Sequence, residues 1–290
     1  MLPVIIQTYL VLLGLLVLGA SPQQATRAAR QPLEREPLLA VTTFNVNYAL
    51  AGDAATLAAI TEAPADLIFL QETNRAWQRQ VQPQLAARYP HQSWHDRPRA
   101  GGQAVLARWP LQAKQVLPSP TGWFPAVRVV VQTPLGQVQV LAVHLHPQVT
   151  EQGSWLLGHF ATDALRLQEI AGYVDSLEKS LPTLIVGDFN EGTDGAALRF
   201  LEARGFRSAL PEFAPEATTW HWPLGRLELH GQLDHLLYDA WFEPLSAAVI
   251  KSGRSDHFPV CGQFARATAG SERPRAPRGA SMTITRAAHK

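Results

Sequence analysis

The chain contains almost no cysteine. Cys261 is the only one in 290 residues, which excludes an internal disulfide and a zinc site built from cysteine ligands. Its position in the apolar run 258–264 is typical of a small buried hydrophobic residue.

The central part of the chain also lacks an excess of positive charge. Residues 38–266 contain 17 Lys and Arg against 21 Asp and Glu, a net charge of −4, whereas the remaining ends carry 8 against 3, a net charge of +5. Proteins that hold long nucleic acid non-specifically are normally basic, because their affinity comes from neutralising phosphates. The composition therefore disfavours long duplex DNA as a ligand of the central part.

No charged side chain occurs in residues 1–26, and residues 4–20 are almost wholly apolar. Seventeen helical residues span roughly 25 Å, close to the lower limit for crossing a bilayer. We therefore expect residues 1–21 to be a single N-terminal membrane span. A cleaved signal peptide is the alternative, although the segment lacks a positively charged start and a small-x-small cleavage site. Arg27, Arg30 and Arg35 follow the span and favour a cytoplasmic domain, but one short segment leaves the side of the membrane open.

Three further parts follow from composition. Residues 22–37 include three prolines and are predicted to be a linker. Residues 267–290 are rich in Arg, Pro, Ala, Gly and Ser and are predicted to be a disordered basic tail. Residues 38–266 contain no repeat and no long Pro/Gly/Ser break, which indicates one domain.

Strand-like and helical patterns alternate within residues 38–266, which indicates an α/β fold. The predicted strands are 38–46, 66–70, 103–107, 126–132, 137–145, 181–186, 232–238 and 259–264. The predicted helices are 53–62, 75–88, 161–181 and 195–203. Three aromatic segments, 123–124, 155–157 and 220–222, are expected to be loops. Core packing is their commoner use, and a rim that contacts lipid or an unstacked nucleotide is the alternative.

Polar side chains gather where the predicted strands end. Asp188 and Asn190 directly follow an apolar run, and their spacing of two places both on one side. Similar residues occur at the other strand ends: Asn45, Glu72, His144 with His146, Asp234, and Asp256 with His257. One such residue alone is more often a cap or a turn residue, but six groups together predict one crevice at a sheet edge.

The motifs around these residues resemble those of the endonuclease/exonuclease/phosphatase superfamily, in order, from about residue 38 to 266. The matching segments are Thr43-Phe44-Asn45-Val46, Leu70-Gln71-Glu72, Gly102 to Arg108, Val143-His144-Leu145, Gly187-Asp188-Phe189-Asn190, Leu233-Asp234 and Ser255 to Val260. The resemblance implies a deoxyribonuclease I-like fold of two mixed β-sheets packed face to face with helices outside, a four-layer α/β sandwich.

The resemblance also implies roles for individual residues. Glu72, with Asn45 and Asp256, corresponds to the metal site, with Mg²⁺ as the cofactor and Mn²⁺ as an alternative. The catalytic residues it implies are His144, Asp188, Asn190, Asp234 and His257. His146 would face the same side of a strand as His144, so either could be the catalytic imidazole. In deoxyribonuclease I an acidic residue orients this histidine; it has no clear counterpart in this sequence, and Asp96 is the nearest candidate.

Cleavage of a phosphate ester requires an in-line water and stabilisation of charge on the phosphoryl oxygens. Asp188 with His257 suits the water, and the N–H groups of Asn190 and of a protonated His144 suit the phosphate. The sequence therefore predicts a membrane-anchored, Mg²⁺-dependent hydrolase of phosphodiesters or phosphomonoesters, in nucleic acid or in a lipid headgroup as with sphingomyelinases, and no protein partner. A non-catalytic scaffold with this fold would be expected to lack at least one of these residues, and none is lacking.

Overall fold

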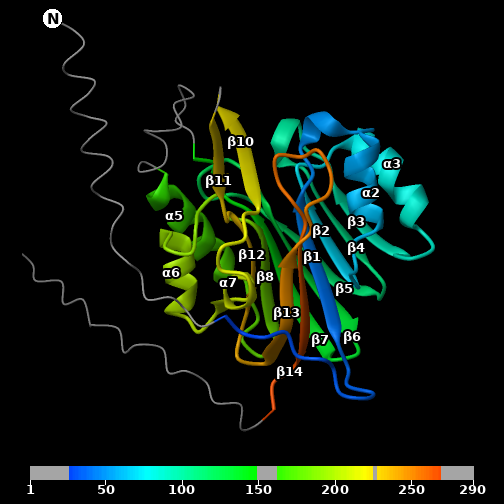
Figure 1. Cartoon of the computed structure of the whole chain (residues 1–290), viewed down its shortest axis with the longest axis vertical. Helices are drawn as coiled ribbons and strands as arrows, with labels where there is room; N and C mark the ends of the chain where they lie inside the picture. Colours follow the sequence, from blue (N-terminus) through cyan, green and yellow to red (C-terminus); the bar gives the residue numbers. More distant parts are fainter. Residues whose placement is uncertain (1–25, 149–161, 225–226, 269–290) are drawn as a thin grey trace, which may run out of the picture.

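A computed structural model of the chain describes residues 26–148, 162–224 and 227–268 (Figure 1). The predicted membrane segment 1–21 and nearly all of the predicted tail lie outside these residues. Among the residues that are described, no helix is both long and apolar enough to cross a membrane.

Two six-stranded sheets form the centre of the molecule. The first has the order β13-β14-β1-β2-β4-β3 and the second the order β5-β6-β7-β8-β12-β9. In the first, β1 pairs with β2 in parallel, and in the second, β7 pairs with β8 in parallel. The other pairings are antiparallel. Both sheets are therefore mixed, as predicted.

The strands of the first sheet are β1 (Leu39–Asn45), β2 (Leu67–Gln71), β3 (His91–His95), β4 (Gln103–Ala107), β13 (Phe242–Val249) and β14 (Val260–Arg266). Those of the second are β5 (Leu111–Leu117), β6 (Ala126–Thr133), β7 (Gly136–His144), β8 (Thr183–Asp188), β9 (Arg207–Ser208) and β12 (Asp234–Tyr238). A separate hairpin consists of β10 (Trp220–Leu224) and β11 (Leu227–Gly231).

Helices cover the outer faces of the two sheets (Figure 1). The helices are α2 (Ala54–Thr61), α3 (Arg75–Leu85), α5 (Asp163–Val174), α6 (Ala196–Glu202) and α7 (Leu210–Phe213), with short 3₁₀ turns η1 (Tyr48–Leu50) and η2 (Arg99–Gly101). One apolar cluster lies between α2, α3 and the first sheet, and another between α5, α6 and the second sheet. A third, larger cluster joins the inner faces of both sheets. The four-layer α/β sandwich is thus confirmed.

The inner faces of four strands change from apolar to polar toward one end of the sandwich. In β8, Leu184 and Val186 belong to the inter-sheet core, and the next residue on that face is Asp188. Side chains alternate along a strand with period two, so every second residue lies on the inner face, and the polar residue at the strand end follows the core residues on that same face. β1 leads in the same way to Asn45, β7 to His144, and β12, running in the opposite direction, begins with Asp234.

Several elements differ from their prediction. Strands β3, β5, β9, β11 and β13 were not predicted. β3 and β5 are mostly exposed or half-buried, and a bulge between Pro244 and Ser246 interrupts the alternation of the largely buried β13. Residues 220–222 are not a loop but strand β10, which pairs with β11 and bridges through Trp220 to His257. The described part of the predicted linker also contacts the domain: the Arg30 backbone N–H donates to Leu245 O at 2.9 Å, and Arg27 forms ion pairs with Glu212 and Glu243.

Candidate functional site

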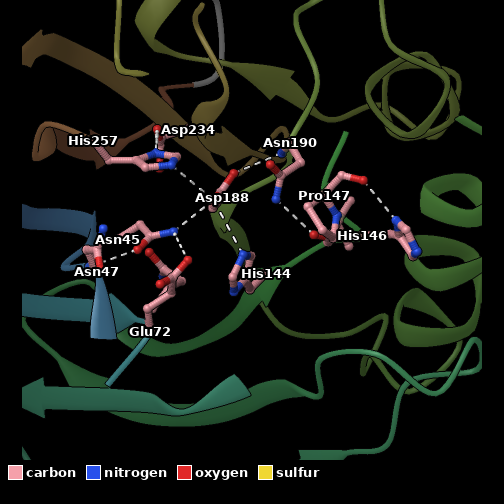
Figure 2. A network of polar contacts seen from close by, with 12 residues as sticks. Asn45, Asn47, Glu72, His144, His146, Pro147, Asp188, Asn190, Asp234 and His257 are labelled. Atoms are coloured by element: carbon pink, nitrogen blue, oxygen red, sulfur yellow. Dashed lines mark hydrogen bonds and ion pairs between the residues drawn. The ribbon is translucent and has the colours of Figure 1, made fainter. Parts of the chain in front are cut away.

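Asp188 is the centre of the polar end of the sandwich (Figure 2). Its carboxylate is only 1% exposed. Oδ2 accepts a hydrogen bond from Asn45 Nδ2 at 3.0 Å and lies 3.5 Å from Nε2 of both His144 and His257. Oδ1 accepts the Asn190 backbone N–H at 2.9 Å. Four of the other predicted residues therefore contact the carboxylate of Asp188, from segments of both sheets.

Asp234 and His257 form a buried carboxylate–imidazole pair. Asp234 Oδ2 lies 2.8 Å from His257 Nδ1, which leaves Nε2 directed at Asp188. Thr219 Oγ1 accepts the backbone N–H of Asp234 at 3.0 Å and fixes the start of β12. Although burial opposes a charged ring, the carboxylates of Asp234 and Asp188 raise the pKa of His257 to about 10. The ring is therefore cationic at neutral pH.

Glu72 lies beside this group and is linked to it by Asn45. Asn45 Nδ2 donates to Glu72 Oε1 at 3.1 Å as well as to Asp188, and the Tyr48 backbone N–H donates to Glu72 Oε2 at 3.3 Å. Burial raises the pKa of the Glu72 carboxyl group. Its backbone φ of 59° lies in the left-handed region, which non-glycine residues rarely adopt and which is found at functional sites.

Asn47 is a site residue that the sequence motifs did not reveal. Its Nδ2 donates to Asp256 Oδ1 at 3.0 Å, and its backbone N–H donates to Asn45 Oδ1 at 3.1 Å. Asp256 is thus joined to Asn45 through one asparagine, while Ser255 Oγ donates to the Asn45 carbonyl at 2.7 Å. The spacing of two between Asn45 and Asn47 is the signal that could have identified it.

His144, and not His146, contacts Asp188. The Phe124 ring stacks on His144 with centroids 4.1 Å apart and planes 20° from parallel. Burial lowers the pKa of His144, which favours the neutral ring at pH 7. The strand ends at His144, and the His146 ring lies apart from Asp188 (Figure 2), against Trp123 and with Nδ1 2.9 Å from Pro147 O.

Asp96 does not orient His144. It pairs instead with Arg75 at 2.7 Å, and its side chain is 38% exposed. The family resemblance made Asp96 the nearest candidate, but its surface position after the end of β3 directs its carboxylate toward α3.

Asn190 is held in a fixed orientation by the loop after β7. Its Nδ2 donates to Leu145 O at 2.9 Å, and its carbonyl accepts from Gln148 Nε2 at 2.8 Å. One N–H of the side-chain amide uses this bond, which leaves the other for a ligand. The φ of Asn190 is 51°, so the chain turns sharply directly after Asp188.

Two groups of side chains could hold a cation. Asp188, Asp234 and His257 offer donor atoms that lie within 4.8 Å of one another. Glu72, Asn45 and Asp256 offer only oxygen ligands in the adjoining part of the polar cluster, linked as described above. Oxygen ligands are those that Mg²⁺ prefers, and a buried carboxylate with a raised pKa is stabilised by a nearby cation.

Comparisons with solved structures show the same fold. The chain is similar to an endonuclease/exonuclease/phosphatase protein from Beutenbergia cavernae, with 20% identity and a TM-score of 0.62 over 79% of this chain and 72% of that one. It is also similar to the human Nocturnin catalytic domain with bound sulfate, with 17% identity and a TM-score of 0.63 over 80% and 96% of the two chains. A third similar structure is D. rerio TDP2 complexed with single strand DNA product, with 15% identity and a TM-score of 0.61 over 78% of this chain and 98% of that one.

A search of curated protein sequences gives no match. The family model described as Endonuclease/Exonuclease/phosphatase family matches residues 42–257, which is most of the chain and contains every residue of the site. The chain therefore belongs to the endonuclease/exonuclease/phosphatase family.

Proposed function

We propose that this protein hydrolyses phosphate esters with the help of Mg²⁺, or of Mn²⁺ in its place. The observation that carries the proposal is the double hydrogen bond of Asn45 Nδ2, at 3.1 Å to Glu72 and 3.0 Å to Asp188. This bond links Glu72, whose carboxylate is suited to bind a cation, with Asp188, whose carboxylate lies near two imidazole rings. A cation and an activated water can therefore act on one phosphate.

Glu72, Asn45 and Asp256 would hold the cation. Mg²⁺ usually takes one or two protein carboxylates and completes its shell with water and substrate phosphate. When bound, it would neutralise charge on the phosphate oxygens and relieve charge on the leaving group. We do not assign Asp234 and His257 as ligands of the cation, because the 2.8 Å contact between them has the geometry of a strong hydrogen bond.

The remaining residues act on the water and the phosphoryl oxygens. Asp188 orients the attacking water and accepts its proton, since it is the one carboxylate that faces both imidazoles. His257, held cationic by Asp234, donates from Nε2 to a phosphoryl oxygen. The free N–H of Asn190 and the neutral ring of His144 donate from other sides.

Hydrolysis of bis-p-nitrophenyl phosphate during an Mg²⁺ titration tests the proposal. We expect Glu72→Gln to raise the Mg²⁺ concentration at half-maximal rate by about ten-fold or more, because it removes a charged ligand. Glu228→Gln is the matched control, since that carboxylate is half exposed in the hairpin and its ion pair is with His230. Unchanged Mg²⁺ dependence in Glu72→Gln, or full activity in His257→Ala, would refute the assignment.

The class of phosphate ester is a separate proposal. Nucleic acid is one candidate, because the similar TDP2 structure was obtained with a single strand DNA product. A phospholipid is the second candidate. It is favoured by exposed aromatic residues next to the site: Trp123 is 38% exposed and precedes Phe124, and Trp222 is 48% exposed and follows the residues that contact Asp256 and His257. Exposed tryptophans are frequent where proteins contact lipid.

Parallel assays on sphingomyelin vesicles and plasmid DNA separate the two substrates. If the substrate is a lipid, Trp123→Ala and Trp222→Ala in a protein that begins at residue 22 should reduce sedimentation with vesicles and leave hydrolysis of the soluble diester unchanged. Trp241→Ala is the matched control, because Trp241 is 47% exposed at the opposite end of the sheets. Cleavage of DNA alone, with no vesicle binding, would exclude the lipid candidate.

We also propose that residues 1–21 attach the domain to a membrane. The support is the absence of charge in residues 1–26 and the apolar composition of residues 4–20. Carbonate extraction of membranes should leave the full chain in the pellet and release a chain that begins at residue 22. If the protein expressed from the full sequence is recovered without its first residues, the segment is instead a cleaved signal peptide.

A further inference from the structure

Helix α5 carries a buried polar face behind the site. Arg166, Glu169 and Tyr173 follow one another at spacings of three and four, which places them on one side of the helix. All three side chains are at most 1% exposed. Arg166 and Glu169 contact loops, whereas Tyr173 packs in the apolar cluster of the second sheet and reaches a loop through its hydroxyl group. Hydrophobic packing therefore does not explain the two charged side chains.

Glu169 joins two loops that border His144. Its Oε2 accepts the His146 backbone N–H at 2.8 Å, two residues after His144. Its Oε1 accepts the Ser119 hydroxyl at 2.9 Å and also the Thr121 hydroxyl. Residues 119–121 lead directly to Phe124, whose ring stacks on His144. One carboxylate therefore holds both the chain after His144 and the loop that covers its ring.

Arg166 and Tyr173 extend the same set of contacts. Arg166 Nε donates to Glu191 Oε2 at 3.1 Å, and NH1 donates to His146 O at 3.3 Å. Glu191 directly follows Asn190, so this ion pair holds the loop after β8. Tyr173 OH donates to Phe124 O at 2.6 Å. The three residues thus reach each segment that flanks His144 and Asn190.

Burial of Glu169 does not serve an ion pair. Among the described residues its hydrogen-bond donors are two hydroxyls and one backbone N–H, and no Lys, Arg or His pairs with it. A buried carboxylate without a cation is costly. An apolar side chain could fill the volume at lower cost, but it could not join the two loops.

We propose that Glu169 is a positioning residue for phosphate ester hydrolysis, which holds His144 and Phe124 in the orientation that the reaction needs. The inference rests on the proposed function. It also predicts where the effect stops: Glu72, Asn45 and Asp256 belong to the first sheet and its connecting loops, with which Glu169 has no hydrogen bond. Loss of Glu169 should therefore disturb turnover and leave cation binding intact.

The experiment compares three variants of the full chain. Glu169→Ala removes all three bonds, Glu169→Gln keeps an acceptor and the length of the side chain, and Gln168→Ala changes the exposed neighbour on α5. We expect Glu169→Ala to lower kcat for bis-p-nitrophenyl phosphate at least ten-fold while the Mg²⁺ concentration at half-maximal rate changes less than two-fold. Glu169→Gln should recover most of the loss, and Gln168→Ala should match the parent protein.

A second measurement does not depend on activity. Trp123 lies in the held loop and packs on His146 with centroids 4.2 Å apart. In protein labelled with 5-fluorotryptophan, the Trp123 signal in the ¹⁹F spectrum, assigned with Trp123→Phe, should shift or broaden in Glu169→Ala and not in Gln168→Ala. This readout reports the loop even if Glu169→Ala also lowers the melting temperature.

The outcomes separate the two proposals. An inactive parent protein that still shows the Trp123 change would refute hydrolysis but keep the role of Glu169 in holding the loop. An active parent with unchanged kcat in Glu169→Ala would refute the positioning role alone. A large change in Mg²⁺ dependence, or equal loss of kcat in Glu169→Gln and Glu169→Ala, would also overturn it, because either would indicate general damage or a need for the charge itself.

Discussion

At the scale of single residues, the site depends on side chains that neighbouring groups hold in states they would not otherwise adopt. His257 is cationic in a buried position because two carboxylates face its ring. His144, which faces one of the same carboxylates, is neutral because burial dominates. Two imidazoles on opposite sides of Asp188 therefore differ in charge, and environment rather than residue type sets that difference.

The charge of Asp234 should matter more than its size. Asp234→Asn keeps the shape of the side chain but removes a negative charge from beside Nδ1, so the pKa of His257 should fall and the wrong tautomer becomes available. We expect kcat/KM for bis-p-nitrophenyl phosphate to fall by about 10²- to 10⁴-fold. Asp96→Asn is the control, because Asp96 pairs with Arg75 at the surface; an equal loss in both variants would refute the role of Asp234.

At the scale of elements, the site depends on how closely β7 and β8 approach each other. Gly187 immediately precedes Asp188 and has a φ of 141°. A Cβ at this position would lie 2.0 Å from the Val143 carbonyl oxygen, on the strand that ends in His144. The absence of a side chain at residue 187 therefore lets His144 and Asp188 stand beside each other in the parallel pair.

Gly187→Ala should separate these strands. The added methyl group meets backbone, which cannot rotate aside, and the φ is unfavourable for alanine. We expect urea unfolding to show a loss of at least about 3 kcal/mol. Gly205→Ala is the control: its φ is 92° but nothing lies within 4 Å of the new Cβ, so a loss of only about 1 to 2 kcal/mol is expected. Equal losses would show that strand separation contributes nothing.

At the scale of the whole molecule, buried polar contacts stabilise the sandwich together with its apolar clusters. His235 lies on the outer face of β12, with Nδ1 3.1 Å from Ser208 Oγ and Nε2 3.0 Å from Glu191 O. It joins the edge strand β9, the loop after Asn190 and the second sheet. Burial lowers the pKa of His235 to about 4, so a neutral imidazole is part of the folded state.

Acid should weaken the fold through His235. Below pH 6.5 the unfolded chain binds a proton on this residue, while the folded chain does so only near pH 4. Stability from this residue is therefore complete above pH 6.5 and is lost as the pH falls toward 4, by about 3 kcal/mol. Urea unfolding in EDTA should show a shallower decline in His235→Gln. His230→Gln, at a half-exposed position, should decline like the parent protein, and a parallel decline in all three would refute the assignment.

The sequence by itself determined the family, the alternation of strands and helices, and most of the polar residues that the fold brings together around Asp188. Asn45, Glu72, His144, Asp188, Asn190, Asp234, Asp256 and His257 could be identified because each follows or begins an apolar run with a recognisable local pattern. Local pattern carries this information because side-chain alternation in a strand depends only on neighbours along the chain.

Only the tertiary structure decided which residues contact each other in the site and which of its histidines are charged. Asn47 contacts Asp256 across 209 positions, and Glu169 contacts Ser119 across 50; no local pattern reports such pairs. That His144 rather than His146 contacts Asp188 depended on where β7 ends. The difference in charge between neutral His144 and cationic His257 depended on burial and on carboxylates from other strands. Electrostatic environment is a property of distances in space, which the order of residues does not contain.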